Sequence, residues 1–209
     1  MKLLKQVLIV TILFILFNIP SLFAEEWIQY TNLDDISDIA EDGDFLWIGT
    51  DAGLVKMNKE TDEKTFYNNA NSGLPSNYVS CITIDSNSNN IWIGTNYGMV
   101  KYDGKYWTEY NINNSGLPDN MIYCMTLDDK GNIWIGVGGG VFSSGLVKYD
   151  GIDWTIYNKS NSGIPANRIY CISIDSNGDK WIGLQMVLQY MMIKIGLIII
   201  RKTPVCQII

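Results

Sequence analysis

Acidic turns are the first places in this chain where side chains could do chemistry. In Asp175-Ser176-Asn177-Gly178-Asp179 the oxygen-bearing side chains have a spacing that resembles part of a calcium loop. Calcium needs six or more oxygen ligands, however, and no Glu closes a loop of the EF-hand kind here. The chain also contains no His, which removes the commonest general base and metal ligand. We therefore expect hairpin turns at these positions, no catalytic or metal site, no cofactor and no enzymatic activity.

Cysteine could form disulfides or act as a nucleophile. Cys81, Cys124 and Cys171 occupy one position in three successive repeats of the sequence. Equivalent positions on neighbouring repeats should lie farther apart than the ~7 Å that a disulfide tolerates between Cα atoms. We therefore expect these three cysteines to be small buried hydrophobic residues.

Tryptophan could provide flat surfaces on which sugar rings stack. Two series recur, one of which follows a hairpin turn while the other begins the last strand of each repeat. The first series is Trp47, Trp92, Trp134 and Trp181, and the second is Trp27, Trp107 and Trp154. Because each residue returns at an identical repeat position, core packing is favoured over ligand binding for both series.

Polar residues after three Gly-Pro crossovers are candidate ligand contacts. The crossovers are residues 72–75, 115–118 and 162–165, and each links one repeat to the next. The candidate contacts that follow them are Asn77, Asn120, Asn167 and Arg168. The third repeat also has a longer loop in residues 137–145, which should share one mouth with the crossovers. Because function concentrates in loops held by a rigid scaffold, we add Gly139, Phe142 and Ser143 from this loop, and Tyr97. The alternatives are rigid crossover geometry and a solvated insertion without function.

The elements that position these residues follow from an internal repeat. The triplet Trp-Ile-Gly recurs at Trp47, Trp92, Trp134 and Trp181, at a period close to the 40–45 residues of a propeller blade. The clearest copy divides into four short pieces rich in β-branched and aromatic residues, at residues 78–85, 91–95, 98–104 and 107–111. Four short strands in each repeat predict an all-β β-propeller, present as an incomplete arc of about three and a half four-stranded blades.

The predicted organisation assigns most of the chain to this propeller, residues 25–183. We expect an outer closing strand in residues 25–32 and half of a fourth blade in residues 167–183. The three complete blades are predicted at residues 33–68, 77–111 and 120–158.

The amino-terminal residues have the pattern of a secretory signal. Lys2 and Lys5 precede an apolar run in residues 7–17, and a stretch of small residues ends at Ala24. The run falls short of the ~20 residues that span a bilayer. We therefore predict a signal peptide in residues 1–24 and an exported chain, periplasmic or at the cell surface; a retained anchor is the alternative.

Residues 184–209 leave the repeat pattern. They contain no Asp or Glu and are crowded with Ile and Met. When Gln185-Met186-Val187 and Tyr190-Met191-Met192 are read from the third base of their first codon, the shifted codons specify the Gly and Asp that a third blade strand would need. We predict that a one-base frameshift near Leu184 produced this tail, which is then not native blade sequence. The alternative is a genuine apolar tail that docks on a membrane as a helix.

The repeats resemble those of a known family. The resemblance lies in Asp128, Gly131-Asn132-Ile133-Trp134-Ile135-Gly136 and Gly145-Leu146-Val147-Lys148-Tyr149-Asp150, which are similar to two-component-regulator propeller repeats. Such repeats occur in periplasmic sensor domains of bacterial hybrid histidine kinases and in free-standing exported proteins. The resemblance covers residues 27–183. It implies a propeller that binds an extracellular ligand, often a carbohydrate, and signals to a membrane histidine kinase.

Composition narrows the partners further. The formal net charge is −7, and every Asp and Glu lies within residues 25–183, so the chain should repel nucleic acid. The leading hypothesis is a non-catalytic exported ligand-sensing module, a truncated piece of a two-component sensor or a related protein. The alternative is an adhesion or protein-interaction propeller without a small ligand. A lyase similar to the streptogramin-inactivating propellers is disfavoured, because that resemblance implies a catalytic His that the chain lacks.

Overall fold

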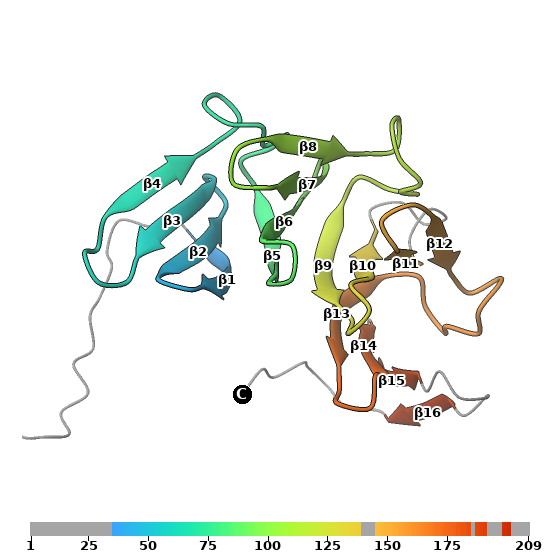
Figure 1. Ribbon diagram of the computed structural model, residues 1–209. Helices are drawn as coiled ribbons and strands as arrows, with labels where there is room; N and C mark the ends of the chain where they lie inside the picture. Colours follow the sequence, from blue (N-terminus) through green and yellow to red (C-terminus); the bar gives the residue numbers. More distant parts are fainter. Residues whose placement is uncertain (1–34, 139–144, 185–186, 192–197, 202–209) are drawn as a thin grey trace, which may run out of the picture. The chain divides into compact units, whose positions relative to one another are not determined.

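The computed structural model describes residues 35–138, 145–184, 187–191 and 198–201. These residues form four antiparallel four-stranded sheets, in each of which strands that follow one another in sequence pair side by side (Figure 1). We call the sheets blades 1 to 4. No segment within these ranges is a helix that could cross a bilayer. The prediction of an all-β propeller arc is confirmed.

The strands of the first three blades lie within the ranges expected from the repeat. Blade 1 contains β1 Ile36–Asp42, β2 Phe45–Thr50, β3 Leu54–Asn58 and β4 Lys64–Tyr67. Blade 2 contains β5 Val79–Asp85, β6 Asn90–Thr95, β7 Gly98–Tyr102 and β8 Trp107–Tyr110. Blade 3 contains β9 Ile122–Leu127, β10 Ile133–Val137, β11 Gly145–Tyr149 and β12 Trp154–Tyr157.

Blade 4 combines repeat sequence with part of the tail. Its first two strands, β13 Ile169–Ile174 and β14 Lys180–Leu184, continue the pattern of the other blades. The backbone of β15 Val187–Met191 pairs with β14, and that of β16 Ile198–Arg201 pairs with β15. Backbone pairing at a sheet edge makes little demand on side-chain identity, so the frameshift origin of these residues stays a prediction.

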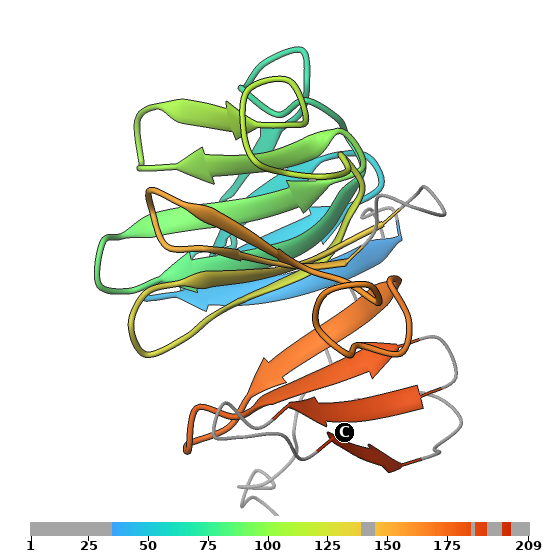
Figure 2. The same ribbon diagram turned by 90° about the vertical axis from the view of Figure 1, so that its right-hand side faces the viewer.

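The four sheets pack through their first strands. β1 lies beside β5, β5 beside β9, and β9 beside β13, whereas β4, β8 and β12 lie away from these contacts (Figure 1, Figure 2). Each sheet therefore buries a face against the next one, as blades do around a propeller axis. The predicted signal peptide (residues 1–24) and closing strand (residues 25–32) lie outside the described residues.

In blades 1 to 3 the glycine of the Trp-Ile-Gly triplet is required by a close approach to the next blade. A Cβ at Gly94 would lie 2.5 Å from Sγ of Cys81 and 2.8 Å from Cγ2 of Ile122 in blade 3. Gly136 has the same relation to Cys124 and to Ile169 in blade 4. Only a residue without a side chain leaves space for both neighbours, which explains why the triplet repeats.

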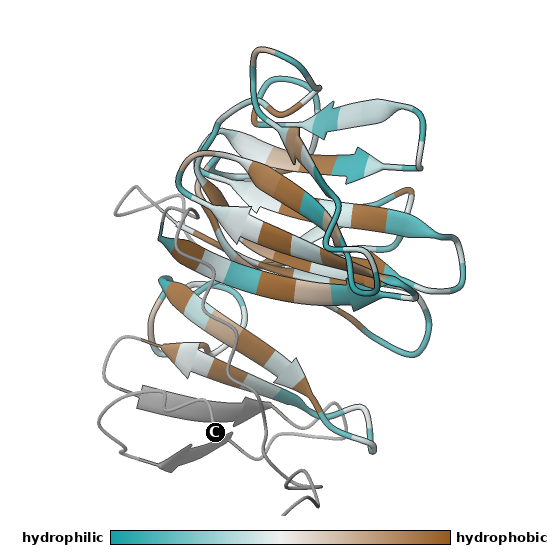
Figure 3. Ribbon diagram, turned by 90° about the vertical axis from the view of Figure 1, so that its left-hand side faces the viewer, coloured by the Kyte–Doolittle hydropathy of each residue, from teal (hydrophilic) through white to brown (hydrophobic). Residues whose placement is uncertain are grey.

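Three of the four tryptophans of the triplet belong to the core, as expected, whereas Trp181 is 37% exposed. Trp47, Trp92 and Trp134 are buried, and each stacks on, or is tilted against, a tyrosine of its own last strand at a centroid distance of 5.7–5.9 Å. Apolar residues accordingly run along the strands that face neighbouring sheets (Figure 3). Cys81 and Cys124 are unbonded thiols packed within these layers.

The second tryptophan series packs on the crossovers. A Cβ at Gly73 would lie 2.2 Å from Cβ of Trp107, and one at Gly116 would lie 2.5 Å from Cβ of Trp154. Trp107 also stacks on Tyr102 at a centroid distance of 4.3 Å. The crossover glycines are therefore needed for contact with an indole as well as for a turn.

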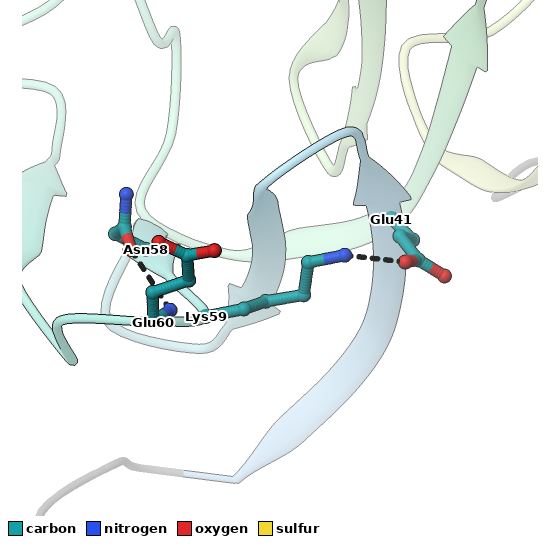
Figure 4. A network of polar contacts seen from close by, with 4 residues as sticks. All are labelled: Glu41, Asn58, Lys59 and Glu60. Carbon is teal, nitrogen blue, oxygen red and sulfur yellow. Dashed lines mark hydrogen bonds and ion pairs between the residues drawn. The ribbon is translucent and has the colours of Figure 1, made fainter.

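A surface ion pair joins the β3–β4 turn of blade 1 to β1. Nζ of Lys59, which follows β3, donates a hydrogen bond of 2.5 Å to Oε1 of Glu41 in β1 (Figure 4). The Asn58 side chain accepts the backbone N–H of Glu60 at 2.9 Å and so orders the same turn (Figure 4). Such exposed pairs contribute little to stability.

Candidate functional site

An open pocket of about 400 Å³ lies where the first strands of blades 1, 2 and 3 begin. The residues that line it come from these strands, from the β6–β7 turn and from the crossovers before β5 and β9. They are Ser37, Tyr78, Ser80, Asn96, Met121, Ile122 and Tyr123. The pocket therefore opens at the same end of the blades as the crossovers.

A β-bulge in each first strand shapes this pocket. The pairing with the second strand shifts at Ser37, Ser80, Tyr123 and Tyr170, which occupy one repeat position in the four blades. Bulges bend a strand and re-aim a side chain, and they are common next to functional sites. Three of the four bulge residues, from blades 1, 2 and 3, line the pocket.

The two bulge serines also connect the blades. Oγ of Ser37 donates a hydrogen bond to the carbonyl of Val79 in blade 2. Oγ of Ser80 donates in the same way to the carbonyl of Ile122 in blade 3, at 2.6 Å. These bonds hold the inner strands side by side and keep the hydroxyls at the pocket wall.

Aromatic side chains replace the serines at the boundary between blades 3 and 4. The rings of Tyr123 and Tyr170 are tilted against each other with centroids 5.6 Å apart. The interaction of the Arg168 guanidinium with Tyr170 raises the pKa of Arg168 above its ordinary value. The predicted contact Arg168 therefore lies next to the Tyr123–Tyr170 pair. Of these two tyrosines, Tyr123 lines the pocket.

Asn96 contributes a buried, unsatisfied hydrogen-bond acceptor to the pocket. Its Oδ1 is buried and has no hydrogen-bond partner in the described structure. A buried acceptor without a donor costs about 1–3 kcal/mol. A ligand donor that reached this oxygen from the pocket would remove that cost.

The three predicted asparagines hold the crossovers. Oδ1 of Asn77, of Asn120 and of Asn167 each accepts a backbone N–H from eight residues earlier, at 2.9 Å. The pocket is instead lined by the residue that follows in the first two cases, Tyr78 and Met121. Ligand contact at the predicted residues stays a prediction, and sequence reasoning did not single out the lining residues Tyr78, Ser80, Asn96 and Tyr123.

The remaining predicted contacts fall around the pocket or beyond the described residues. Tyr97 is exposed and directly follows the pocket residue Asn96. Gly139, Phe142 and Ser143 lie outside the described residues. The shared repeat position of Ser37, Ser80 and Tyr123 is the sequence signal that could have identified the pocket wall.

The thiols near the pocket lie in buried surroundings. Burial raises the pKa of the Cys81 thiol to about 12 and also raises the pKa of Cys124, so neither is a ready nucleophile. No carboxylate is present among the described residues that line the pocket. The described residues also contain no group of three His, Cys, Asp or Glu side chains that could hold a metal ion.

The acidic turns lie at the opposite ends of the strands and serve as hairpins. Asp128 accepts the backbone N–H of Lys130 and of Asn132, and Asp175 accepts those of Asn177 and Asp179. Their oxygens are thus used to order the turn before each Trp-Ile-Gly strand. This arrangement agrees with the prediction of hairpin turns.

Comparison with solved structures identifies the fold. The extracellular domain of a protein described as a hybrid two-component system from B. thetaiotaomicron has a TM-score of 0.50 and 22% identity, with 81% of this chain and 28% of that chain covered. PorZ, a surface component of the type-IX secretion system of Porphyromonas gingivalis, has a TM-score of 0.56 and 19% identity, with 75% and 24% covered. An ancestral GH74 enzyme has a TM-score of 0.56 and 16% identity, with 76% and 23% covered. At these identities the likeness concerns the fold alone, and the chain spans about a quarter of each structure.

Comparison with protein families concerns the repeats themselves. No curated protein matches the sequence significantly. The family model described as "Two component regulator propeller" matches residues 73–97 and 116–139. Both segments run from the crossover glycine through the first strand to the end of the Trp-Ile-Gly strand. Over these two segments the repeats of the chain match those of the two-component regulator propeller family.

Proposed function

We propose that the chain is a non-catalytic, exported ligand-sensing module that binds a neutral ligand in the pocket at the mouth of blades 1 to 3. The observation that carries the proposal is the buried, unpaired Oδ1 of Asn96 beside a wall of hydroxyl and aromatic groups. The described lining residues are all uncharged, which favours an uncharged ligand. A carbohydrate has the matching chemistry, because its hydroxyls donate hydrogen bonds while its ring faces pack on tyrosine.

Signalling is the second part of this proposal. A solved structure with the same fold is the extracellular domain of a hybrid two-component system. We infer that the ligand signal of this chain passes to a membrane histidine kinase. The leader-like residues 1–24 support export.

The experiment is a screen of neutral oligosaccharides on a glycan array, followed by calorimetry on any hit. We expect one oligosaccharide class to bind, and we expect Asn96→Ala and Tyr78→Ala each to weaken binding at least tenfold. Tyr106→Ala is the control, because Tyr106 is an exposed tyrosine in the β7–β8 turn at the opposite end of blade 2. If Tyr106→Ala weakened binding as much as the pocket variants, or if Asn96→Ala left the affinity unchanged, this pocket would be rejected as the binding site.

Adhesion or protein interaction is the second candidate function. Tyr78, Tyr97 and Tyr170 are all exposed near the mouth, and exposed tyrosines are enriched at protein interfaces. A glycan array without any hit would favour this alternative.

A further inference from the structure

The wall of the pocket repeats from blade to blade. Blade 2 contributes Tyr78 and Ser80 to it, and blade 3 contributes Met121 and Tyr123 at the same two repeat positions. In each blade the first of these residues directly precedes the first strand, and the second lies at the bulge of that strand. These two repeat positions therefore face the pocket in both blades.

Blade 4 has Arg168 and Tyr170 at the same two positions. Arg168 directly precedes β13, and Tyr170 lies at the bulge of β13. Tyr123 joins them to the pocket, because it lines the pocket and its ring centroid lies 5.6 Å from that of Tyr170. The wall of the pocket therefore continues from Tyr123 onto blade 4.

The charge at the first of these repeat positions changes sign around the mouth. From blade 1 to blade 4, the residues at this position are Asp35, Tyr78, Met121 and Arg168. The turn after the second strand also loses its charge beyond blade 1, with Asp51, Asn96 and Gly138 in blades 1, 2 and 3. The mouth is thus acidic at blade 1, uncharged at the pocket and carries a cation at blade 4. An anionic group would be repelled from blade 1 and attracted to blade 4.

The guanidinium group of Arg168 is accessible to a ligand. Arg168 is exposed, and among the described residues it forms no ion pair. Its interaction with Tyr170 holds the side chain beside the tyrosine pair. A guanidinium presents a planar fork of donors that matches a carboxylate, and the neighbouring aromatic rings can pack on the face of a sugar.

We propose that a ligand bound in the pocket extends over Tyr123 and Tyr170 and places an anionic group on Arg168. This inference rests on the proposed function, because Asn96 and the neutral pocket must hold the other end of the ligand. The ligand class is then an oligosaccharide in which a neutral sugar lies in the pocket and the next sugar carries a carboxylate. The acidic side chains of blade 1 set the direction, because a reversed ligand would place its carboxylate beside Asp35 and Asp51.

The test compares pairs of disaccharides that differ in one group. Cellobiose, lactose and maltose are each paired with the form in which C6 of the non-reducing sugar is a carboxylate. Affinities for the full chain are measured by ligand-observed NMR titration at low salt. We expect at least one acidic disaccharide to bind roughly fivefold more tightly than its neutral partner, which is the upper range for an exposed ion pair. This preference should disappear at about 1 M salt, because salt screens exposed charges.

Variants separate the anionic subsite from the pocket. Arg168→Gln should abolish the preference and leave the affinity for the neutral disaccharide unchanged, whereas Arg168→Lys should retain part of the preference. Asn96→Ala should weaken binding of both members of a pair equally. Lys159→Gln is the matched control, because Lys159 is an exposed cation in the same connection between β12 and β13, and it should keep the preference.

Each outcome bears on one of the two proposals. Equal affinities within every pair, a preference that survives Arg168→Gln, or one that Lys159→Gln also removes would overturn the anionic subsite and leave the proposed function in place. Loss of the acidic preference in Arg168→Gln with the neutral affinity intact would support the subsite. If no disaccharide of the panel binds, the subsite is rejected and the proposed function rests on the glycan array alone.

Discussion

The indole Nε1 of Trp134 donates a hydrogen bond of 2.9 Å to Oδ2 of Asp128, the residue that begins the hairpin before the Trp strand. Trp47 occupies the same position in blade 1, and its Nε1 is buried without a hydrogen-bond partner. The difference lies in the hairpins. The turn between β1 and β2 contains only residues 43–44, so no carboxylate is placed as Asp128 is in the longer turn of blade 3.

We predict that Trp134→Phe destabilises the protein more than Trp47→Phe. The two tryptophans are otherwise matched, since both are buried and both stack on a tyrosine at an interplanar angle of 22°. Trp134→Phe removes a hydrogen bond to a carboxylate, whereas Trp47→Phe removes a buried donor that had no partner. The difference in the free energy of unfolding should be about 1–3 kcal/mol, measured by urea titration. Equal losses would mean that the bond to Asp128 contributes nothing.

Gly94→Ala should destabilise the interface between blades 2 and 3 by about 1–3 kcal/mol, because the new methyl group overpacks it. The nearest obstacle is Sγ of Cys81, 2.5 Å from the ideal Cβ position. Removing that sulfur with Cys81→Ala should recover part of the loss. The measurement is a double-mutant cycle on unfolding free energies, and strictly additive effects would show that the sulfur is not the obstacle.

Much of the fold could be predicted from the sequence because its strongest constraints are local and repeated. The Trp-Ile-Gly triplet marks the second strand of each blade, and Gly94 and Gly136 are fixed by contacts that recur in each copy. The pairing of β15 and β16 could not be predicted in this way. Their residues carry no repeat pattern, and the structure places them through backbone pairing of β15 with β14 and of β16 with β15.

No predicted contact among the described residues lines the pocket, although Asn77 and Asn120 each precede a residue that does. Three asparagines after the crossovers, such as Asn77, were natural candidates, but a polar side chain in a crossover can bond its own loop or face a ligand. In the structure Asn77 accepts the N–H of Asn69, and the next residue, Tyr78, lines the pocket. The bulge that places Ser80 on the pocket wall breaks strict alternation, so a simple strand pattern does not reveal it.

Asp38→Asn should raise the free energy of unfolding at pH 7 and change how that free energy depends on pH. Burial raises the pKa of Asp38 above its usual value, although its carboxylate accepts the N–H of Ile82 at 2.7 Å and that of Ile39. A raised pKa means that the stability contributed by the protonated group is present below the unfolded pKa and is lost as pH rises through the folded pKa. The advantage of the Asn variant should therefore grow from pH 4 to pH 7 in urea titrations.

Asp128→Asn is the matched variant, and its effect on stability at pH 7 should have the opposite sign to that of Asp38→Asn. Burial of Asp128 disfavours its charge, but hydrogen bonds from Trp134 and Asn132 outweigh this effect and lower its pKa. The carboxylate then contributes stability above its unfolded pKa, and this contribution is lost as pH falls through the folded pKa. The Asn variant should be less stable than the wild type at pH 7, and the difference should shrink toward pH 3. If both variants were more stable than the wild type at pH 7, or both less stable, the opposite pKa directions given for Asp38 and Asp128 would be contradicted.

Lys180→Ile should stabilise the boundary between blades 3 and 4 by about 1 kcal/mol, as repeat-consensus substitutions commonly do. Lys180 is 2% exposed at a repeat position where blades 2 and 3 have the buried Ile91 and Ile133. Its Nζ donates to the carbonyl of Gly178 at 2.9 Å and lies 4.6 Å from the centroid of the Trp134 ring. We expect the cost of burying the ammonium group to exceed these contacts, because an isoleucine would pack on the same indole without carrying a charge.

The pH dependence of this gain identifies its cause. Burial lowers the pKa of Lys180, so between the folded and unfolded pKa values the unfolded chain binds more protons and wild-type stability rises with pH. The advantage of Lys180→Ile should therefore narrow as pH rises from 7 toward 10, whereas Lys130→Ile, in the exposed β9–β10 turn, should give no advantage at pH 7. A variant less stable than the wild type at pH 7 would show that the contacts to Gly178 and Trp134 outweigh the cost of burial.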